Sequence, residues 1–237
     1  MQTLQIANPV RPDELDGLRR QIIVIPDHLT SDLCREIVAR VESRPKRGLA
    51  VTVPAESGTQ RAMMAPDVRR TATVDLTDMD DALNALVGGI ATDVMEPAYG
   101  AVDYWSRPQA LFYEPGGRYD LHADSDLPEL RPDGTTSWRR ANERDVSLIC
   151  YLNSDFEGGQ LGFPFLGVTV TPAARMLVCF PSHHKFAHQA ELVTAGARYA
   201  LVSWASLVGT PRFHERPKAY VLNPRPGLGC PRPGSQP

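Results

Sequence analysis

The chain has 237 residues, a formal net charge of −3 at pH 7 and a sequence pI near 6.1. Hydrophobic residues make up 42% and charged residues 22%, which excludes a disordered chain, and the absence of a basic stripe argues against a nucleic-acid partner. No apolar run reaches the roughly 20 residues of a membrane span, and no targeting segment is evident. We therefore expect a cytoplasmic protein with one domain over residues 1–210 and a Pro-rich tail at 211–237.

Two helices are predicted in the first hundred residues. The apolar run QIIVIP reads as a strand, and after it a cap at Thr30 or Ser31 opens a segment whose apolar residues recur at helical spacing up to Val41. A second segment, residues 79–100, carries an apolar stripe from Leu83 to Val94 and is expected to end where Pro97 and Gly100 forbid continuation. Both helices should pack outside a sheet.

From Ala110 onward the chain changes to short β-rich runs separated by Gly, Pro, Asn and Asp. The runs are ALFYE, RYDLH, DVSLICYL, QLGFPF, VTVTP, MLVCF and YALVSWA. Short strands at this spacing predict an antiparallel sandwich or jelly roll, so the fold is expected to be mainly β with flanking helices (α+β). Residues 125–144 are polar and lack periodicity, a length of loop that is typical of active-site lids, and we expect a lid there.

The candidate metal site begins with His122 and Asp124 in YDLHADSD. On a strand, residues two apart point to the same face, so both side chains can aim at one point. The pair alone is a weak motif, because chance supplies such spacings readily. His188 in KFAHQAEL is the candidate third ligand, since two imidazoles and one carboxylate form the face that holds Fe(II) with open positions. His183 and His184 compete for that role and are taken as loop residues.

Arg198 follows His188 at strand-register distance and alternates with Ala200, Val202 and Trp204 on one face of RYALVSWA. An arginine among apolar neighbours is costly unless paired, and its planar fork suits a carboxylate. The partner is either a ligand carboxylate, which we favour, or a protein acid at the end of the barrel.

Two further features stand in the β-rich half. Gly158 and Gly159 stand beside a strand start, where the missing β-carbons allow positive φ or close backbone approach. Tyr113 and Tyr151 lie in strand segments where a phenol could reach a polar ligand or simply pack in the core. The four cysteines lie far apart without a CxxC pair, which favours packed thiols over disulfides or zinc.

Four segments together resemble, in order and spacing, the prolyl 4-hydroxylase-like branch of the Fe(II)/2-oxoglutarate-dependent dioxygenases. The resemblance spans roughly residues 105–206, the expected core of the domain, and rests on these segments: FYEPGGRYDLHADSD, DVSLICYLNSDFEGGQLGFP, MLVCFPSHHKFAHQAELV and GARYALVSWA. It implies a double-stranded β-helix, also called a jelly roll, and the cosubstrates 2-oxoglutarate and O₂. Ascorbate is a candidate reductant for keeping the iron reduced.

The resemblance also implies roles for single residues. Fe(II) would be held by His122, Asp124 and His188, and the distal carboxylate of 2-oxoglutarate by Arg198 with Tyr151 as a second donor. The other implied contacts are Tyr113 to the cosubstrate and Trp204 in the pocket lining. Candidates for substrate contact in and near the polar insert are Arg118, Trp138, Arg139 and Arg140, although solvated loop charge is the simpler interpretation.

The leading functional hypothesis is hydroxylation of an unactivated C–H bond in a small molecule or amino acid, with succinate and CO₂ as co-products. Asp124 favours hydroxylation over halogenation, because the halogenating relatives lack this carboxylate. The alternative within enzymes is a peptidyl-prolyl or other protein side-chain hydroxylase. The alternative from a different class is a non-catalytic, metal-binding jelly-roll sensor. The sequence leaves the oligomeric state open.

Overall fold

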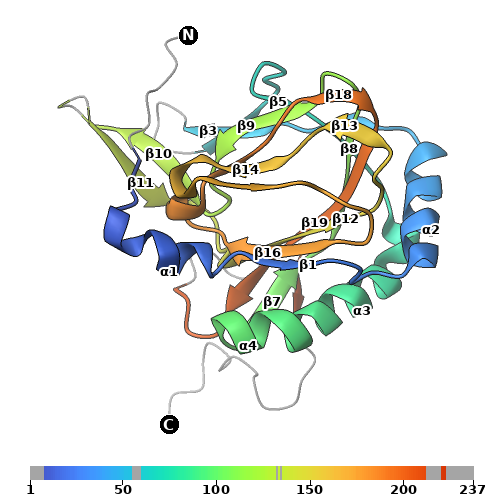
Figure 1. Cartoon of the computed structure of the whole chain (residues 1–237), viewed down its shortest axis with the longest axis horizontal. Coiled ribbons are helices and arrows are strands. Elements are labelled where there is room, and N and C mark those ends of the chain that lie inside the picture. The colour runs from blue at the N-terminus through green and yellow to red at the C-terminus, as the bar shows by residue number, and fades with distance from the viewer. Residues whose placement is uncertain (1–7, 55–59, 132, 134, 212–219, 223–237) are drawn as a thin grey trace.

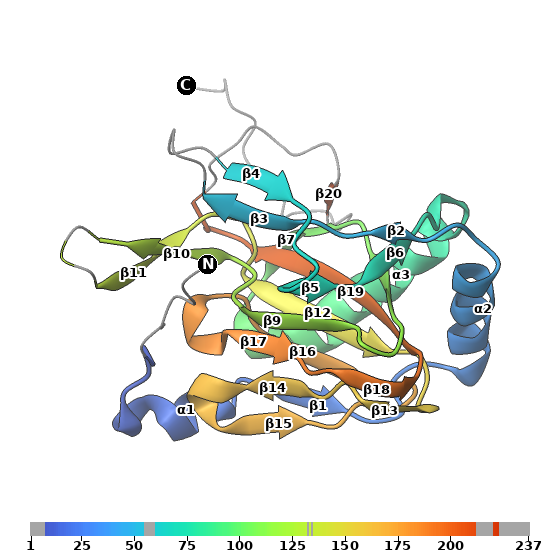
Figure 2. The same cartoon turned by 90° about the horizontal axis from the view of Figure 1, so that it is seen from above.

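The structure is a computed structural model that describes residues 8–54, 60–131, 133, 135–211 and 220–222. Most of the Pro-rich tail predicted at 211–237 lies outside these residues. Two antiparallel sheets face each other across the molecule, as Figures 1 and 2 show. Among the described residues, no helix is long and apolar enough to cross a membrane.

The major sheet has nine strands in the order β1-β16-β12-β19-β8-β6-β2, with β7 pairing β19 and β20 pairing β7. Its strands are β1 (Ile23–Ile25), β2 (Arg47–Gly48), β6 (Ala72–Val74), β7 (Val102–Ser106), β8 (Gln109–Tyr113), β12 (Val146–Tyr151), β16 (Leu177–Pro181), β19 (Arg198–Leu207) and β20 (Tyr220–Leu222). The minor sheet has the order β15-β14-β17-β9-β5. Its strands are β5 (Arg69–Arg70), β9 (Arg118–His122), β14 (Leu161–Phe163), β15 (Val168–Val170) and β17 (His188–Ala190). This is the predicted double-stranded β-helix.

Three two-stranded ribbons complete the β structure. They are β3 (Val51–Pro54) with β4 (Gln60–Met63), β10 (Asp126–Leu130) with β11 (Thr136–Arg140), and β13 (Phe156–Gly158) with β18 (Val193–Gly196). All seven predicted β-rich runs contain a strand, and the predicted strand in QIIVIP is β1. The ribbons and the other short strands before residue 110 were not predicted. Short 3-10 turns lie at Pro12–Glu14 (η1), Thr77–Met79 (η2), Pro164–Leu166 (η4) and His184–Phe186 (η5), and a short helix α1 spans Leu15–Arg19.

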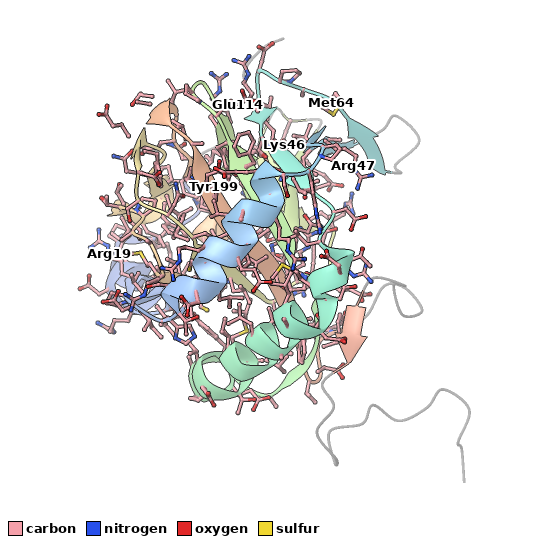
Figure 3. All side chains as sticks on the ribbon, turned by 90° about the vertical axis from the view of Figure 1, so that its right-hand side faces the viewer. Arg19, Lys46, Arg47, Met64, Glu114 and Tyr199 are labelled. Carbon is pink, nitrogen blue, oxygen red and sulfur yellow. The ribbon has the colours of Figure 1, made fainter. Side chains whose placement is uncertain are left out.

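The major sheet separates two hydrophobic cores. On its outer side, helices α2 (Ser31–Glu42) and α3 (Asp80–Ile90) bury an apolar stripe against residues such as Leu201 and Ala205 of β19. Tyr199 shares this side, and its hydroxyl donates to Glu42 of α2 at 3.0 Å. Figure 3, in which Tyr199 is labelled, shows α2 crossing this side of the molecule. Ala200 and Val202 point the other way, into the core between the two sheets.

Helix α2 confirms the predicted cap and stripe. Thr30 is the N-cap, and its side chain accepts a hydrogen bond from the Leu33 amide at 3.3 Å, satisfying one of the free N–H groups of the first turn. Cys34, Ile37 and Val41 are the buried residues of the helix. Cys34, Cys150 and Cys179 are free, buried thiols, as their apolar surroundings predict.

The prediction that Pro97 ends the second helix was wrong. After α3 the chain makes a π-helical turn, η3 (Ala91–Met95), and then a short helix α4 (Glu96–Tyr99) in which Pro97 lies in the first turn. Pro97 follows directly on the π-helical turn, in which the Glu96 N–H donates to the Ala91 carbonyl five residues back, so the proline lies where the α-helical hydrogen-bond pattern is already interrupted. Gly100, with φ of 107°, ends the helix as predicted.

The expectation of an unstructured polar loop at residues 125–144 was also wrong. The segment forms the β10–β11 hairpin, in register from Asp126 opposite Arg140 to Leu130 opposite Thr136. Across the hairpin, Arg139 Nε lies 2.6 Å from Oε1 of Glu129, the partner of Ser137. The strands are stabilised by such polar contacts, so the apolar alternation that indicates a strand is missing. Figure 1 shows the hairpin projecting from the body of the fold. A lid role for it stays a prediction.

Candidate metal and cosubstrate site

The structure brings the three predicted metal ligands together. His122 ends β9, His188 begins β17, and the two residues are direct partners in the β9–β17 ladder. Asp124 Oδ1 lies 3.8 Å from His122 Nε2, and Asp124 Oδ2 lies 3.7 Å from His188 Nε2. One potential ligand atom from each residue lies within 4.8 Å of the other two. Three such atoms can face one metal ion.

Asp124 reaches this position by a different route from the predicted one. Strand alternation does not place it, because β9 ends at His122 and Asp124 lies in the bend that follows. A hydrogen bond of 2.6 Å from the Ser147 hydroxyl to Asp124 Oδ2 holds the carboxylate instead. Ser147 in turn lies 2.8 Å from the Ser182 hydroxyl, and both serines are only 1% exposed. The two serines therefore orient the Asp124 carboxylate.

Both histidines present the nitrogen that a metal needs. His122 Nδ1 lies 2.9 Å from the Asp120 carbonyl oxygen, and His188 Nδ1 lies 3.1 Å from the Phe186 carbonyl oxygen. A carbonyl only accepts hydrogen bonds, so each Nδ1 carries the proton and each Nε2 keeps its lone pair. This is the backbone support that orients histidine ligands in metal sites.

The protonation states also suit a metal. Burial, reinforced by the positive charge that His188 would carry, lowers the pKa of His122 to about 3, so its imidazole is neutral at neutral pH. Burial alone would raise the pKa of Asp124, but the two neighbouring imidazoles, Arg144 and the Ser147 hydrogen bond hold it at about 2. The Asp124 carboxylate and the neutral His122 imidazole are therefore ready to bind a cation without first losing protons.

His183 and His184 do not join this cluster. His184 Nδ1 lies 2.6 Å from Asp126 Oδ2, and the His184 amide donates to the same oxygen at 2.9 Å. Trp138 of β11 stacks on the His184 ring, with centroids 5.4 Å apart. The pairing of His184 with Asp126 fixes the base of the β10–β11 hairpin. His183 packs edge-on against the Phe186 ring, with centroids 5.0 Å apart.

Arg198 is buried in the same interior without a carboxylate partner among the described residues. It is 2% exposed, donates from Nη1 to the Gly159 carbonyl at 2.6 Å, and lies over the Tyr113 ring at 4.0 Å. Its Nε and the hydroxyl of Tyr151 are both buried without a hydrogen-bond partner in the described structure. Burial raises the pKa of Tyr151 to about 12, so the hydroxyl remains a donor. These free donors fit a ligand carboxylate.

The glycine pair allows this approach. Gly158 and Gly159 both have positive φ, 73° and 65°. A β-carbon at Gly158 would stand 2.1 Å from the Leu192 carbonyl oxygen, and one at Gly159 would stand 3.2 Å from Arg198 Cδ. The predicted reason for the pair, close approach combined with positive φ, is therefore what the structure shows.

The remaining predicted residues divide between the interior and the surface. Trp204 is half-buried against the core between the sheets, on the face of β19 that carries Arg198, as the alternation predicts. Arg118 binds the Asp67 carbonyl and lies 3.2 Å from Asp120 Oδ1 at the surface. Trp138 stacks on His184 rather than on the triad. Substrate contact by Arg118 or Trp138 stays a prediction.

Sequence reasoning missed several residues around the triad. Tyr119 stacks on the His122 ring with centroids 3.5 Å apart, and Arg69 and Arg144 each lie over an aromatic ring of the interior. For Ser147 a signal was present, since it is a polar residue on the inward-facing positions of an otherwise apolar strand. Arg69 lies in a two-residue strand without a pattern of its own, so nothing in the sequence pointed to it.

A jelly roll that combines a His-Asp-His cluster with a buried, unpaired arginine defines the mononuclear Fe(II) oxygenases that take a keto-diacid cosubstrate. In agreement, residues 108–206 match the model of the 2OG-Fe(II) oxygenase superfamily. This part of the chain, which contains His122, Asp124, His188 and Arg198, is thus similar to that superfamily.

Each match to a curated relative covers only part of this chain and only part of the relative. Prolyl 3-hydroxylase 2 of Gallus gallus is 34% identical over 109 residues, which are 43% of this chain and 15% of that protein. Prolyl 4-hydroxylase 1 of Arabidopsis thaliana is 28% identical over 167 residues, which are 69% of this chain and 53% of that protein. The chain thus spans about a seventh of the first relative and about half of the second.

Solved structures share the fold. The viral collagen prolyl hydroxylase of Paramecium bursaria Chlorella virus-1, in complex with 2-oxoglutarate, superposes with a TM-score of 0.57 and 16% identity over 79% of this chain and 97% of that one. A prolyl-4-hydroxylase of Pseudomonas putida gives a TM-score of 0.51 with 22% identity over 83% of this chain and 98% of that one. These similarities establish the double-stranded β-helix.

Proposed function

We propose that this protein is an Fe(II)- and 2-oxoglutarate-dependent hydroxylase that acts on prolyl residues of a peptide or protein. The observation that carries the proposal is the buried pair of Arg198 Nε and the Tyr151 hydroxyl, two free donors in the same interior as the His-Asp-His cluster. Prolyl hydroxylases recur among both the curated relatives and the solved structures. This replaces a small molecule as the preferred substrate, because the relatives and structures described above are prolyl hydroxylases.

The proposed roles follow from the geometry. His122, Asp124 and His188 would hold the iron. Arg198 and Tyr151 receive the distal carboxylate of 2-oxoglutarate, and Tyr113 supports the guanidinium by its ring face. The bound iron supplies O₂ chemistry in which one oxygen atom enters a C–H bond of the substrate and the other enters succinate as CO₂ is released. Trp204 is assigned to the substrate side.

The first experiment tests the cosubstrate site without turnover. Anaerobic addition of Fe(II) and then 2-oxoglutarate should produce a weak metal-to-ligand charge-transfer band. His122→Ala and Asp124→Ala should abolish the band, while the surface variant Arg35→Gln, whose side chain is 72% exposed on α2, should retain it. Absence of the band in the native protein would contradict the proposal.

The second experiment tests the substrate. Proline-containing peptides are incubated with Fe(II), 2-oxoglutarate, ascorbate and O₂, and mass spectrometry locates any added oxygen atom. The expected result is peptide hydroxyproline in a 1:1 ratio with succinate. Succinate release stimulated by free amino acids, with no peptide modified, would instead favour the small-molecule hydroxylase.

A further inference from the structure

Three arginines with buried, unpartnered Nε atoms take no part in any ion pair of the described structure. They are Arg69, Arg144 and Arg198. Two further arginines with an unpartnered Nε, Arg118 and Arg140, lie within ion-pair distance of Asp120 and Asp145, at 3.2 Å and 2.6 Å. The 2-oxoglutarate carboxylate accounts for Arg198 under the proposed function. Arg69 and Arg144 remain to be explained.

Arg69 faces the interior from the minor sheet. In the β5–β9 ladder it is the direct partner of Tyr119, and Tyr119 packs against the core between the sheets. The Arg69 guanidinium lies over the Tyr119 ring at 4.4 Å, and Nη1 donates a hydrogen bond to the Ala50 carbonyl at 3.3 Å. Tyr119 in turn stacks on the metal ligand His122. Arg69 is therefore one aromatic ring away from the triad.

Arg144 faces the interior from the loop that leads into β12 of the major sheet. Its guanidinium lies 3.8 Å from the centre of the Trp204 ring, and Nη1 donates a long hydrogen bond of 3.4 Å to the Asp124 carbonyl. Trp204 stands on the inward face of β19, six residues beyond Arg198 on the same face. Arg69 thus reaches the triad through the Tyr119 ring, and Arg144 reaches it at the Asp124 carbonyl.

The charges of the site with Fe(II) and 2-oxoglutarate bound do not explain why Arg69 and Arg144 are there. Fe(II) with Asp124 and 2-oxoglutarate with Arg198 together carry no net charge, so Arg69 and Arg144 would add two positive charges that no described carboxylate balances. Half-buried guanidinium groups without a counter-ion are costly, and a planar fork stacked on an aromatic ring is pre-organised to bind a carboxylate.

We propose that Arg69 and Arg144 bind an anionic group of the substrate, so that the preferred peptide carries a carboxylate close to the reacting proline. The proposal rests on the proposed function and narrows it to acidic peptides. Binding of the carboxylate between the two sheets places the neighbouring residue beside the open face of the triad. Stacking on Tyr119 and Trp204 keeps both guanidinium groups in place before the substrate arrives.

The test compares isosteric peptides. The probes are fluorescent pentapeptides with a central proline, in which one of the four flanking positions is Glu or Gln and the other three are Ala. Binding is measured by anisotropy to the anaerobic protein loaded with Fe(II) and 2-oxoglutarate, so no turnover is needed. We expect one Glu peptide to bind about tenfold more tightly than its Gln counterpart, with the preference falling as salt increases.

Matched variants assign the preference to the two arginines. Arg69→Gln and Arg144→Gln should each reduce the Glu-to-Gln preference, and the double variant should bring it close to 1. Arg35→Gln removes the same charge at an exposed position and should keep the preference. Arg69→Lys and Arg144→Lys, which keep the charge, should retain part of it. The charge-transfer band with 2-oxoglutarate verifies that each variant is folded.

The outcomes separate this inference from the proposed function. Equal binding of the Glu and Gln peptides to the native protein, or a preference that survives in the double variant, would overturn the anion site. If no peptide is bound or hydroxylated but free carboxylic acids stimulate succinate release more than their amides, the anion site stands and peptidyl-proline hydroxylation is wrong. If neither peptides nor free acids show a charge preference, the anion site is wrong.

Discussion

The hydroxyl of Ser147 donates a 2.6 Å hydrogen bond to the Oδ2 atom of Asp124, and this bond crosses from the major sheet to the bend after β9. It fixes the one predicted metal ligand that lies outside a strand. The carboxylate therefore depends on a residue of the opposite sheet for its orientation. Ser182 extends the contact, since its hydroxyl lies 2.8 Å from that of Ser147.

Ser147→Ala should weaken Fe(II) binding about 10- to 100-fold, because metal affinity depends on the groups that orient the ligands. Anaerobic titration with Fe(II) by calorimetry measures the change. Ser203→Ala is the matched control, since Ser203 is also a buried serine but its hydroxyl donates to the Ser106 carbonyl on the far side of the sheet. Equal losses of iron affinity in both variants would show that Ser147 acts only on stability.

Arg198→Ala should weaken 2-oxoglutarate binding about 10- to 100-fold while leaving iron affinity nearly unchanged, because it removes a charge-assisted contact to the distal carboxylate only. The charge-transfer band, titrated with 2-oxoglutarate at saturating Fe(II), gives the affinity. Parallel loss of iron and 2-oxoglutarate binding would contradict the assignment of Arg198.

Tyr151→Phe separates ligand binding from stability. The Tyr151 hydroxyl is buried without a described partner, so its removal should leave the ligand-free protein equally stable or more stable. The same change should weaken 2-oxoglutarate about 3- to 10-fold, since one donor to the carboxylate is lost. Urea denaturation and the charge-transfer titration measure the two effects. A less stable variant with unchanged 2-oxoglutarate affinity would show that the hydroxyl serves the fold.

Gly158→Ala should destabilise the protein by about 2–4 kcal/mol, because φ is 73° and the new β-carbon would stand 2.1 Å from the Leu192 carbonyl oxygen. Gly89 in α3 offers the opposite case. A β-carbon there meets nothing within 4 Å, so Gly89→Ala should stabilise the protein by about 0.5–1 kcal/mol. Urea denaturation measures the free energy of unfolding of both variants. An unchanged stability of Gly158→Ala would contradict the close approach of Gly158 to the Leu192 carbonyl.

The metal-free protein should lose stability in mildly acidic solution. The pKa of His122 is about 3 in the folded protein and 6.5 in its ordinary state, so the unfolded chain takes up the proton first. The contribution of the neutral imidazole is intact above pH 6.5 and is lost progressively as the pH falls toward 3. His122→Gln should show a flatter decline over this range in urea denaturation. Parallel curves for the two proteins would contradict the lowered pKa.

Much of the fold could be predicted because its strongest signals are local. The Thr30 cap, the apolar stripe up to Val41 and the β-rich runs after Ala110 each follow from nearest neighbours in the sequence. The β10–β11 hairpin could not be predicted, because its stability comes from cross-strand pairs of polar side chains, such as Arg139 with Glu129, and these resemble solvated loop residues until the register is known.

The candidate site was also predictable only in part. His122, His188 and Arg198 were predicted because strand order and spacing restrict where they lie. Asp124 was identified for a reason that the structure does not support, since a bend and Ser147 place it rather than strand alternation. Arg69 was missed because its contact with Tyr119 joins a two-residue strand to a strand 50 residues later in the chain, and such pairing is set by tertiary structure.

The direct pairing of His122 with His188 has a consequence for folding. The two residues are partners in one ladder but lie 66 positions apart in the chain, and β17 is only three residues long. A metal ion held by both acts as a cross-link that closes this long loop, and it binds only the correctly paired strands, so its binding energy adds to folding stability. Removal of the metal ion by a chelator would therefore loosen the minor sheet.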